Sequence, residues 1–370
     1  MTDIRSKFLS DQLYSKAAAR KMPLSGTFEL SPLCNFACRM CYVRKTPAEV
    51  KAHGRPMLAY EDWLRIAREG KEQGLLFLLL TGGEPLLWPG FWELYGELVD
   101  MGMLVAINTN GSLIDEEAIA RFVRRPPRRV NITLYGGSDG TYAELCGAKG
   151  VFDKVRWAVR SLKEAGIPVK LNCSLTPRNA ADLETITAFA KELQLQLDLA
   201  TYMFPPIRRD PDAVGVNDRF TPAETARYRL KGLALQQGEE ACRGYLARVR
   251  QGSSEPPGLE EGCYDPIDGK VRCRAGSASF WVTWDGFVTA CGMMPEPRVE
   301  LAHRPFAQVW RELTEQTDEL RLSGVCARCA NRAVCHPCAA MAAAETGTPQ
   351  GVPTYLCHVV EELRRIADEI

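Results

Sequence analysis

Short apolar runs alternate with amphipathic segments along residues 26–204. Leu75–Leu80 is an unbroken apolar run of the length and character of a buried parallel strand. Five more runs predict strands, at residues 27–30, 103–108, 130–134, 169–173 and 197–202. The segments between them carry apolar residues at helical spacing and predict helices, at residues 60–74, 91–101, 114–123, 152–165 and 181–193.

Six strand–helix repeats favour one parallel sheet, because parallel strands need a long crossover that is usually a helix. A closed barrel of this kind has eight units. The predicted fold class is therefore α/β, a partial (β/α)6 barrel of the TIM type. Functional residues are expected at the C-terminal ends of its strands.

The second part of the chain has a different composition. Residues 222–251 predict a long helical stretch, and the Gly-, Ser- and Pro-rich segment 252–258 predicts a linker. A cysteine-rich region follows and is closed by an amphipathic helix after Cys357. We expect an N-terminal extension, the barrel, a helical linker and a cysteine-rich domain, at residues 1–25, 26–210, 211–258 and 259–370.

The balanced charge and the lack of an apolar targeting segment argue against nucleic acid and membrane as partners. Lys+Arg and Asp+Glu both number 46, so the net charge is zero and no overall field attracts nucleic acid or an anionic membrane. The N-terminus has no apolar core of a signal peptide, and no apolar run approaches the roughly 18 residues of a membrane-spanning helix. We expect a cytoplasmic protein that binds neither nucleic acid nor membrane.

Fourteen cysteines are many for a chain of 370 residues in a reducing compartment, where clustered cysteines indicate metal or redox chemistry. Cys34, Cys38 and Cys41 form a C-x3-C-x2-C motif directly after the first predicted strand. Three thiolates can hold three irons of a [4Fe–4S] cluster and leave the fourth iron open for chemistry. A zinc-binding loop is the alternative, but three cysteines without an adjacent histidine suit it less well.

This motif resembles the signature of the radical S-adenosylmethionine (SAM) superfamily. The resemblance implies that the open iron binds SAM, that an electron donor such as flavodoxin or ferredoxin serves the cluster, and that a 5′-deoxyadenosyl radical abstracts hydrogen from the substrate. Gly82, Gly83, Glu84 and Pro85 follow the second predicted strand and resemble the family's GGEP motif. Glycine at two positions lets the backbone approach a ligand closely.

The resemblance covers roughly residues 25–205 and implies a set of cofactor contacts. Without the resemblance, each residue of this set is equally well explained as an ordinary core or strand-end residue. Met40 stands where the family places an apolar residue against adenine, and the other implied contacts are Gly82, Gly83, Glu84, Asn108, Asn110, Thr133, Asn172 and Met203.

The C-terminal cysteines resemble the SPASM extension of the same superfamily, over about residues 260–360. The resemblance implies two fully ligated auxiliary [4Fe–4S] clusters, and therefore three [4Fe–4S] clusters in total. It assigns to the first auxiliary cluster Cys263, Cys273, Cys291 and Cys338, and to the second Cys326, Cys329, Cys335 and Cys357. Two residues separate Cys335 from Cys338 where the family usually has three, which puts the assignment of Cys338 in question. Structural zinc ribbons are the alternative.

The family resemblance implies a radical SAM oxidoreductase that oxidatively modifies a peptide, by a thioether or carbon–carbon crosslink or by epimerisation. Only about 25 residues precede the first strand, so a leader peptide is expected to bind the barrel, the helices at 222–251 or a separate leader-binding protein. A small-molecule dehydrogenase is one alternative. A sulfatase formylglycine maturase is another, less favoured because Tyr135-Gly136 stands where those relatives carry an acidic residue.

Several residues of possible chemical use lie outside these motifs, and no catalytic residue is assigned. Cys146, Cys173 and Cys242 are either hydrogen donors for an epimerase or small buried apolar residues. Alternation along the strand turns Cys173 toward the helices if Asn172 faces the barrel interior. Arg208 and Arg209 follow the last strand and either hold a peptide carboxylate or end an exposed loop.

Overall fold

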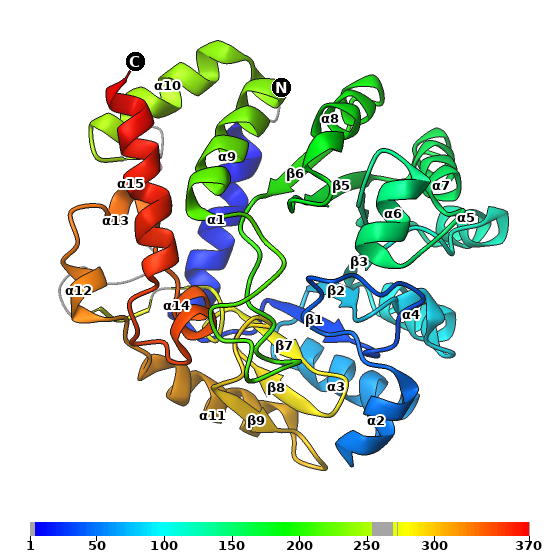
Figure 1. The fold of residues 1–370 in the computed structure, drawn as a ribbon. Coiled ribbons are helices and arrows are strands. Elements are labelled where there is room, and N and C mark those ends of the chain that lie inside the picture. The colour runs from blue at the N-terminus through cyan, green and yellow to red at the C-terminus, as the bar shows by residue number, and fades with distance from the viewer. Residues whose placement is uncertain (1–3, 254–268, 272, 370) are drawn as a thin grey trace.

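A single curved sheet of nine strands organises the molecule (Figure 1). The computed structural model describes residues 4–253, 269–271 and 273–369. Along the sheet the strands follow the order β6-β5-β4-β3-β2-β1-β7-β8-β9. The first six are parallel and span Ser25–Glu29 (β1), Phe77–Thr81 (β2), Leu104–Thr109 (β3), Arg129–Thr133 (β4), Val169–Ser174 (β5) and Gln196–Ala200 (β6). The predicted partial barrel is confirmed, with strand boundaries shifted by about two residues.

The five predicted crossover helices are present on the outer face of this sheet (Figure 1). Their apolar faces pack on the outward side chains of the strands, as Trp63 does on Phe28 with ring centroids 4.9 Å apart. The opposite face of the strands, toward the barrel interior, carries both polar and apolar side chains. The five helices are α3 (Tyr60–Glu72), α4 (Phe91–Asp100), α5 (Glu116–Arg124), α7 (Phe152–Glu164) and α8 (Leu183–Glu192).

The cysteine-rich part does not stand apart from the barrel, because its first strand joins the same sheet. Strand β7 (Ser279–Val282) runs parallel to β1, with Gly26 opposite Phe280. A Cβ atom at Gly26 would lie 2.6 Å from the Phe280 ring, so only glycine admits this close pairing. Antiparallel β8 (Phe287–Thr289) and β9 (Arg298–Glu300) then extend the edge. These three strands were not predicted.

Helix α11 (Phe306–Asp318) covers the added strands, and Phe306 and Trp310 pack on Phe280. Three helices of the first half were also not predicted, namely α1 (Ile4–Ala19), α2 (Pro47–His53) and α6 (Asp139–Cys146). The remaining short helices of the C-terminal part are α12 (Gly324–Ala327), α13 (Arg332–Cys335) and α14 (Ala339–Thr346).

The predicted helical stretch 222–251 is two helices, α9 (Pro222–Gln237) and α10 (Glu239–Arg250), separated at Gly238. Both pack against the last helix, α15 (Thr354–Asp368), in an apolar cluster that includes Leu230, Leu246 and Leu363. Helix α15 begins before Cys357, which therefore lies in its first turn rather than ahead of it. No helix in the described ranges has the length and apolarity that crossing a membrane requires.

Candidate functional site

The first cysteine loop leaves the C-terminal end of β1 and is held in place by α6. The backbone N–H groups of Ala37 and Arg39 donate to the carbonyls of Cys146 and Leu145, at 2.7 and 3.1 Å. These bonds tie the loop to the last turn of a helix more than 100 residues later in the chain. This support was not predicted from the sequence.

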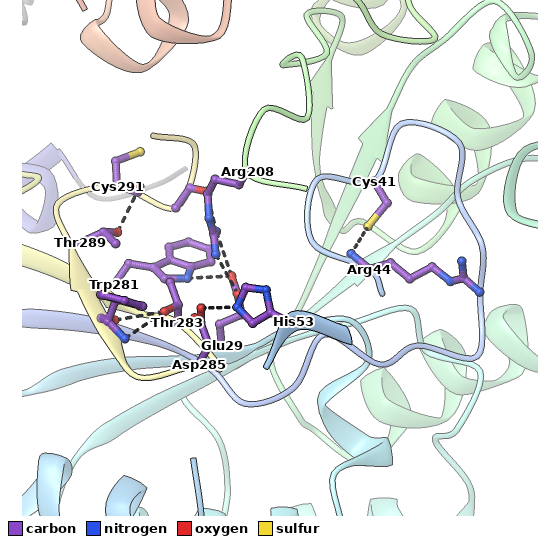
Figure 2. Close-up of polar contacts among 12 residues, drawn as sticks. Glu29, Cys41, Arg44, His53, Arg208, Trp281, Thr283, Asp285, Thr289 and Cys291 are labelled. Carbon is purple, nitrogen blue, oxygen red and sulfur yellow. Dashed lines mark hydrogen bonds and ion pairs between the residues drawn. The ribbon is translucent and has the colours of Figure 1, made fainter. Parts of the chain in front are cut away.

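The three thiols of the loop lie within electrostatic reach of one another. The pKa of Cys34 is raised to about 12, chiefly by burial and also by Glu84, Cys38 and Cys41, against a backbone hydrogen bond from Phe36 that lowers it. That bond joins the Phe36 N–H to Cys34 Sγ at 3.3 Å. Cys41 Sγ accepts the N–H of Arg44 at 3.3 Å (Figure 2). Backbone N–H groups directed at two of the sulfurs suit thiolate ligands, whose charge they stabilise.

Cys146 lies directly against this loop. A hydrogen bond from its thiol, and a weaker influence from Tyr135, lower the pKa of Cys38. Cys146 is fully buried at the end of α6. Cys173 is buried in the core behind β5, as the strand alternation predicted, and Cys242 is buried between α9, α10 and α15. Of the three unassigned cysteines, only Cys146 adjoins the first cysteine loop.

The glycines of the GGEP motif pack closely against the backbone of the segment that precedes the cysteine loop. A Cβ at Gly82 would lie 2.4 Å from the Ser31 carbonyl oxygen, and one at Gly83 would lie 2.2 Å from the Leu33 carbonyl oxygen. Gly83 N–H donates to Ser31 O at 2.7 Å, and Glu84 N–H donates to Leu33 O at 2.9 Å. The motif thus fixes the segment that leads into the cysteine loop.

Glu84 has no exposed surface and joins the ends of two strands. Its carboxylate accepts hydrogen bonds from Thr109 Oγ1 and the Asn110 N–H, both at 2.8 Å, and from the Leu86 N–H at 3.2 Å. Burial raises the pKa of Glu84 to about 7, although these three donors lower it. Asn110 Nδ2 in turn donates to Asn35 Oδ1 at 2.9 Å and lies 3.8 Å from Cys34 Sγ.

The other residues of the predicted cofactor set lie apart from this network. Asn108 accepts a hydrogen bond from Asn131 Nδ2 at 2.7 Å on the inner face of the sheet. Thr133 and Asn172 are direct neighbours across β4 and β5. Met40 and Met203 are both buried in the main apolar core.

An open groove of about 830 Å³ begins at Thr133 and Asn172. It passes Asp198 on β6 and reaches Gln236 on α9. A second cavity of about 430 Å³ shares Gln236 and continues to Met341 on α14. Together they form a channel between the last barrel strand and the helices of the second half.

The C-terminal cysteines fall into two spatial groups. The pKa of Cys291 is raised to about 11, chiefly by burial and also by the neighbouring thiols of Cys338 and Cys273. The pKa of Cys335 is likewise raised to about 12, chiefly by burial and also by Cys357, Cys326 and Cys329. Cys338 thus lies with Cys273 and Cys291 in spite of its unusual spacing. Cys263 lies outside the described residues.

The all-cysteine composition of these groups limits what they can hold. Within the described ranges, no three His, Cys, Asp or Glu side chains converge closely enough to hold one metal ion. Four cysteines suit either a four-iron cluster, whose outer corners bind thiolates, or one zinc ion.

An ion pair that the sequence did not suggest lies in the barrel interior. Arg208 Nη2 donates to Glu29 Oε1 at 2.9 Å and Nη1 donates to Oε2 at 3.0 Å (Figure 2). The Arg208 side chain is 13% exposed, and Glu29 is fully buried. Both predicted roles of Arg208 are therefore wrong, because its guanidinium is neither at an exposed loop end nor free to hold a peptide carboxylate.

Comparisons with known proteins agree with this site. Residues 28–190 match the sequence model of the radical SAM superfamily. The AdoMet-dependent heme synthase of Methanosarcina barkeri is 24% identical over 332 residues, which cover 86% of this chain and 92% of that protein. The mycofactocin maturase MftC of Mycolicibacterium smegmatis is 26% identical over 348 residues, which cover 90% and 82%.

A solved structure extends the comparison to the fold. Streptococcus suis SuiB bound to its precursor peptide SuiA superposes with a TM-score of 0.68 at 16% identity, over 96% of this chain and 82% of SuiB. The likeness includes the added strands and helices of the second half as well as the barrel. With its cysteine motif, its partial barrel and these matches, residues 28–190 form a domain of the radical SAM superfamily, and the chain shares the fold of SuiB.

Proposed function

We propose that this chain is a radical SAM oxidoreductase that oxidatively modifies a peptide substrate. The observation that carries the proposal is the grouping of the cysteines. One group of three lies at the C-terminal end of β1, and two further groups lie in the second half. Three such groups suit a reaction that begins at one centre and passes the substrate's electron to others.

The catalytic cluster would be held by Cys34, Cys38 and Cys41. When bound there, the cluster and SAM supply a 5′-deoxyadenosyl radical. This chain's own residues fix the loop: Glu84 and Asn110 join the β2 and β3 ends to it, and α6 supports it from the other side. Among the implied SAM contacts, Met40 lies within the cysteine loop and Asn110 Nδ2 lies 3.8 Å from Cys34 Sγ. We propose Asn110 together with Gly82 and Gly83 as the cofactor-facing edge, with the buried Glu84 supporting Asn110 from behind.

Two auxiliary [4Fe–4S] clusters would be held by the C-terminal groups, with Cys263 completing the first. The position of Cys338 beside Cys273 and Cys291 supports its assignment to that first cluster. A net oxidation of the substrate leaves one electron after hydrogen abstraction, and these clusters would accept it. An external carrier such as flavodoxin or ferredoxin would supply the electron that starts each turnover.

A peptide substrate is supported by the shape of the channel beside β6. Its two cavities, of about 830 and 430 Å³, share Ala200 and Gln236 in their linings and together reach from Thr133 on β4 to Met341 on α14. Strand β6 is the last strand of the sheet on this side. MftC is named a maturase, and SuiB was solved with a precursor peptide, which supports the same substrate class.

The experiment is an anaerobic turnover assay with reconstituted protein, SAM, a reductant and candidate precursor peptides encoded beside the gene. We expect 5′-deoxyadenosine together with a peptide that has lost two hydrogens or gained a crosslink in the mass spectrum. The Cys38→Ala variant is the negative control. Release of 5′-deoxyadenosine with every neighbouring peptide unchanged would exclude the peptide part of the proposal.

One observation favours a second candidate. The heme synthase of M. barkeri matches 86% of this chain, so a small-molecule reaction of heme synthesis is compatible with the same cysteine groups. The assay that separates the two adds a porphyrin precursor of heme in place of peptide. Product from the porphyrin, and none from the peptides, would favour this candidate.

A further inference from the structure

The Glu29–Arg208 ion pair also contacts the turn that carries Cys291. Arg208 Nη1, besides its bond to Glu29, donates to the Gly292 carbonyl oxygen at 2.7 Å. Trp281 Nε1 donates to Glu29 Oε2 at 2.9 Å. In the view of Figure 2, Arg208, Glu29 and Trp281 lie between Cys291 and Cys41. One guanidinium thus joins β1 to the residue that follows a proposed cluster ligand.

The Cys291 turn is held from two more directions. A Cβ at Gly292 would lie 2.7 Å from the Trp281 indole, so the glycine packs flat on this ring. Thr289 Oγ1 donates to the Cys291 carbonyl oxygen at 3.2 Å. The backbone of the Cys291 turn is therefore held by Arg208, Trp281 and Thr289 together.

The same group reaches the first cysteine loop. Glu29 ends β1, five residues before Cys34. Tyr42, directly after Cys41, places its ring centroid 6.0 Å from the Arg208 guanidinium and 6.5 Å from the Trp281 ring. Arg208 is thus in contact with segments adjacent to ligands of both proposed clusters.

Stability alone does not account for charges at this position. Removing a carboxylate and a guanidinium from water costs several kcal/mol per ion, and apolar residues of similar volume often stabilise a protein as well. The bidentate geometry and the extra acceptors satisfy both groups, so the pair is tolerated rather than required. Its orientation is specific, because the positive end is directed at the Cys291 turn.

We propose that Arg208 is a positioning residue that fixes the Cys291 turn against β1 and, through its charge, raises the reduction potential of the auxiliary centre bound there. The inference rests on the proposed function, because it requires iron at Cys291. A reduced cluster carries one more negative charge than an oxidised one, so a nearby guanidinium favours reduction. The auxiliary centre then accepts the substrate's electron more readily than it would without Arg208.

The test is an EPR-monitored redox titration of the reconstituted protein, preceded by iron and sulfide analysis. Arg208→Gln is expected to shift the auxiliary signal to lower potential and to leave the catalytic signal in place. Arg208→Lys keeps the charge and loses the forked geometry, so it should restore most of the potential. The double variant Glu29→Gln/Arg208→Gln leaves no unpaired buried charge. If Arg208→Gln fails to fold, this double variant takes its place in the titration and should also show a lower potential of the auxiliary signal than wild type.

The matched control is Arg219→Lys. Arg219 forms another buried ion pair in the same segment after β6, with Glu345, at side-chain exposures of 8% and 5%. Its other contacts are with Gly215, Tyr202 and Tyr355, away from the Cys291 turn. This variant should lower thermal stability without shifting either potential. Unchanged potentials in Arg208→Gln, with full iron content, would overturn the inference and leave the proposed function intact. Zinc in place of auxiliary iron would overturn both.

Discussion

Glu84 accepts a hydrogen bond from the Asn110 backbone N–H at 2.8 Å, with no exposed surface on the carboxylate residue. This bond connects the end of β2 to the end of β3 directly beneath the first cysteine loop. Because burial is the larger influence, the pKa of Glu84 rises from 4.5 to about 7. The folded protein therefore holds a proton here that the unfolded chain releases at lower pH.

This relationship predicts a pH dependence of stability. A carboxyl whose folded pKa lies above its unfolded pKa stabilises the fold most at low pH, and the contribution is lost as pH rises from about 4.5 to about 7. At about 1.4 kcal/mol per pKa unit, the loss is of order 3 kcal/mol. Urea denaturation of wild type and Glu84→Gln between pH 5 and 8 measures it. The wild-type free energy of unfolding should fall relative to the variant, and parallel profiles would contradict this account.

The first cysteine loop yields a prediction about SAM cleavage. Replacing Cys34, Cys38 or Cys41 by alanine should abolish production of 5′-deoxyadenosine, because a cluster held by two thiolates is not retained. Cys242→Ala is the matched control, since Cys242 is as buried as Cys38 but lies between α9, α10 and α15. The control should cleave SAM at the wild-type rate and lose about 1 kcal/mol of stability. SAM cleavage at the wild-type rate in the Cys34, Cys38 or Cys41 variants would contradict the assignment of these cysteines as ligands of the catalytic cluster.

The cysteines of the second half yield a prediction that separates formation of the oxidised product from SAM cleavage. Cys291→Ala should keep SAM cleavage, because the first loop is untouched, and should lose the oxidised product. Its iron content should fall by about four per chain. Quantifying 5′-deoxyadenosine and product in the same reaction tests this. Product at the wild-type level would show that the auxiliary site is dispensable.

The GGEP glycines yield a steric prediction. An alanine Cβ at Gly83 would lie 2.2 Å from the Leu33 carbonyl oxygen, and a backbone atom cannot move aside easily. Gly83→Ala should cost about 2 kcal/mol or more and displace the segment that leads to Cys34. Gly140→Ala is the control, because its nearest contact would be Ser138 Oγ at 3.6 Å. Iron content and melting temperature are measured for both variants. A loss in Gly83→Ala but not in Gly140→Ala shows that the steric contact, and not glycine replacement in general, is responsible.

The sequence was most informative where one segment carries a whole signal. Six buried parallel strands appear as apolar runs, and three cysteines on one loop appear as a motif. Strands β7, β8 and β9 were missed because they have only three or four residues each, too few to show a period. Their place in the sheet depends on the Gly26–Phe280 contact, which joins residues more than 250 positions apart.

The interior network was beyond sequence analysis for the same reason. Glu29 and Arg208 are separated by 179 positions, and Trp281 by 252 from Glu29. A polar residue at the end of a strand and an arginine in a loop are individually ordinary. Cys146 also gave no signal, because its place beside Cys38 follows from how α6 packs under the loop. The division of the C-terminal cysteines, by contrast, was accessible through family resemblance.

The most direct test of the account is iron, acid-labile sulfide and zinc per chain after anaerobic reconstitution. Eleven cysteines in three groups predict about twelve irons and twelve sulfides with no zinc, for three four-iron clusters. About four irons with zinc would leave the radical chemistry in place and reduce the second half to a structural role. Zinc without iron would contradict the assignment of the first cysteine loop, and with it the central claim.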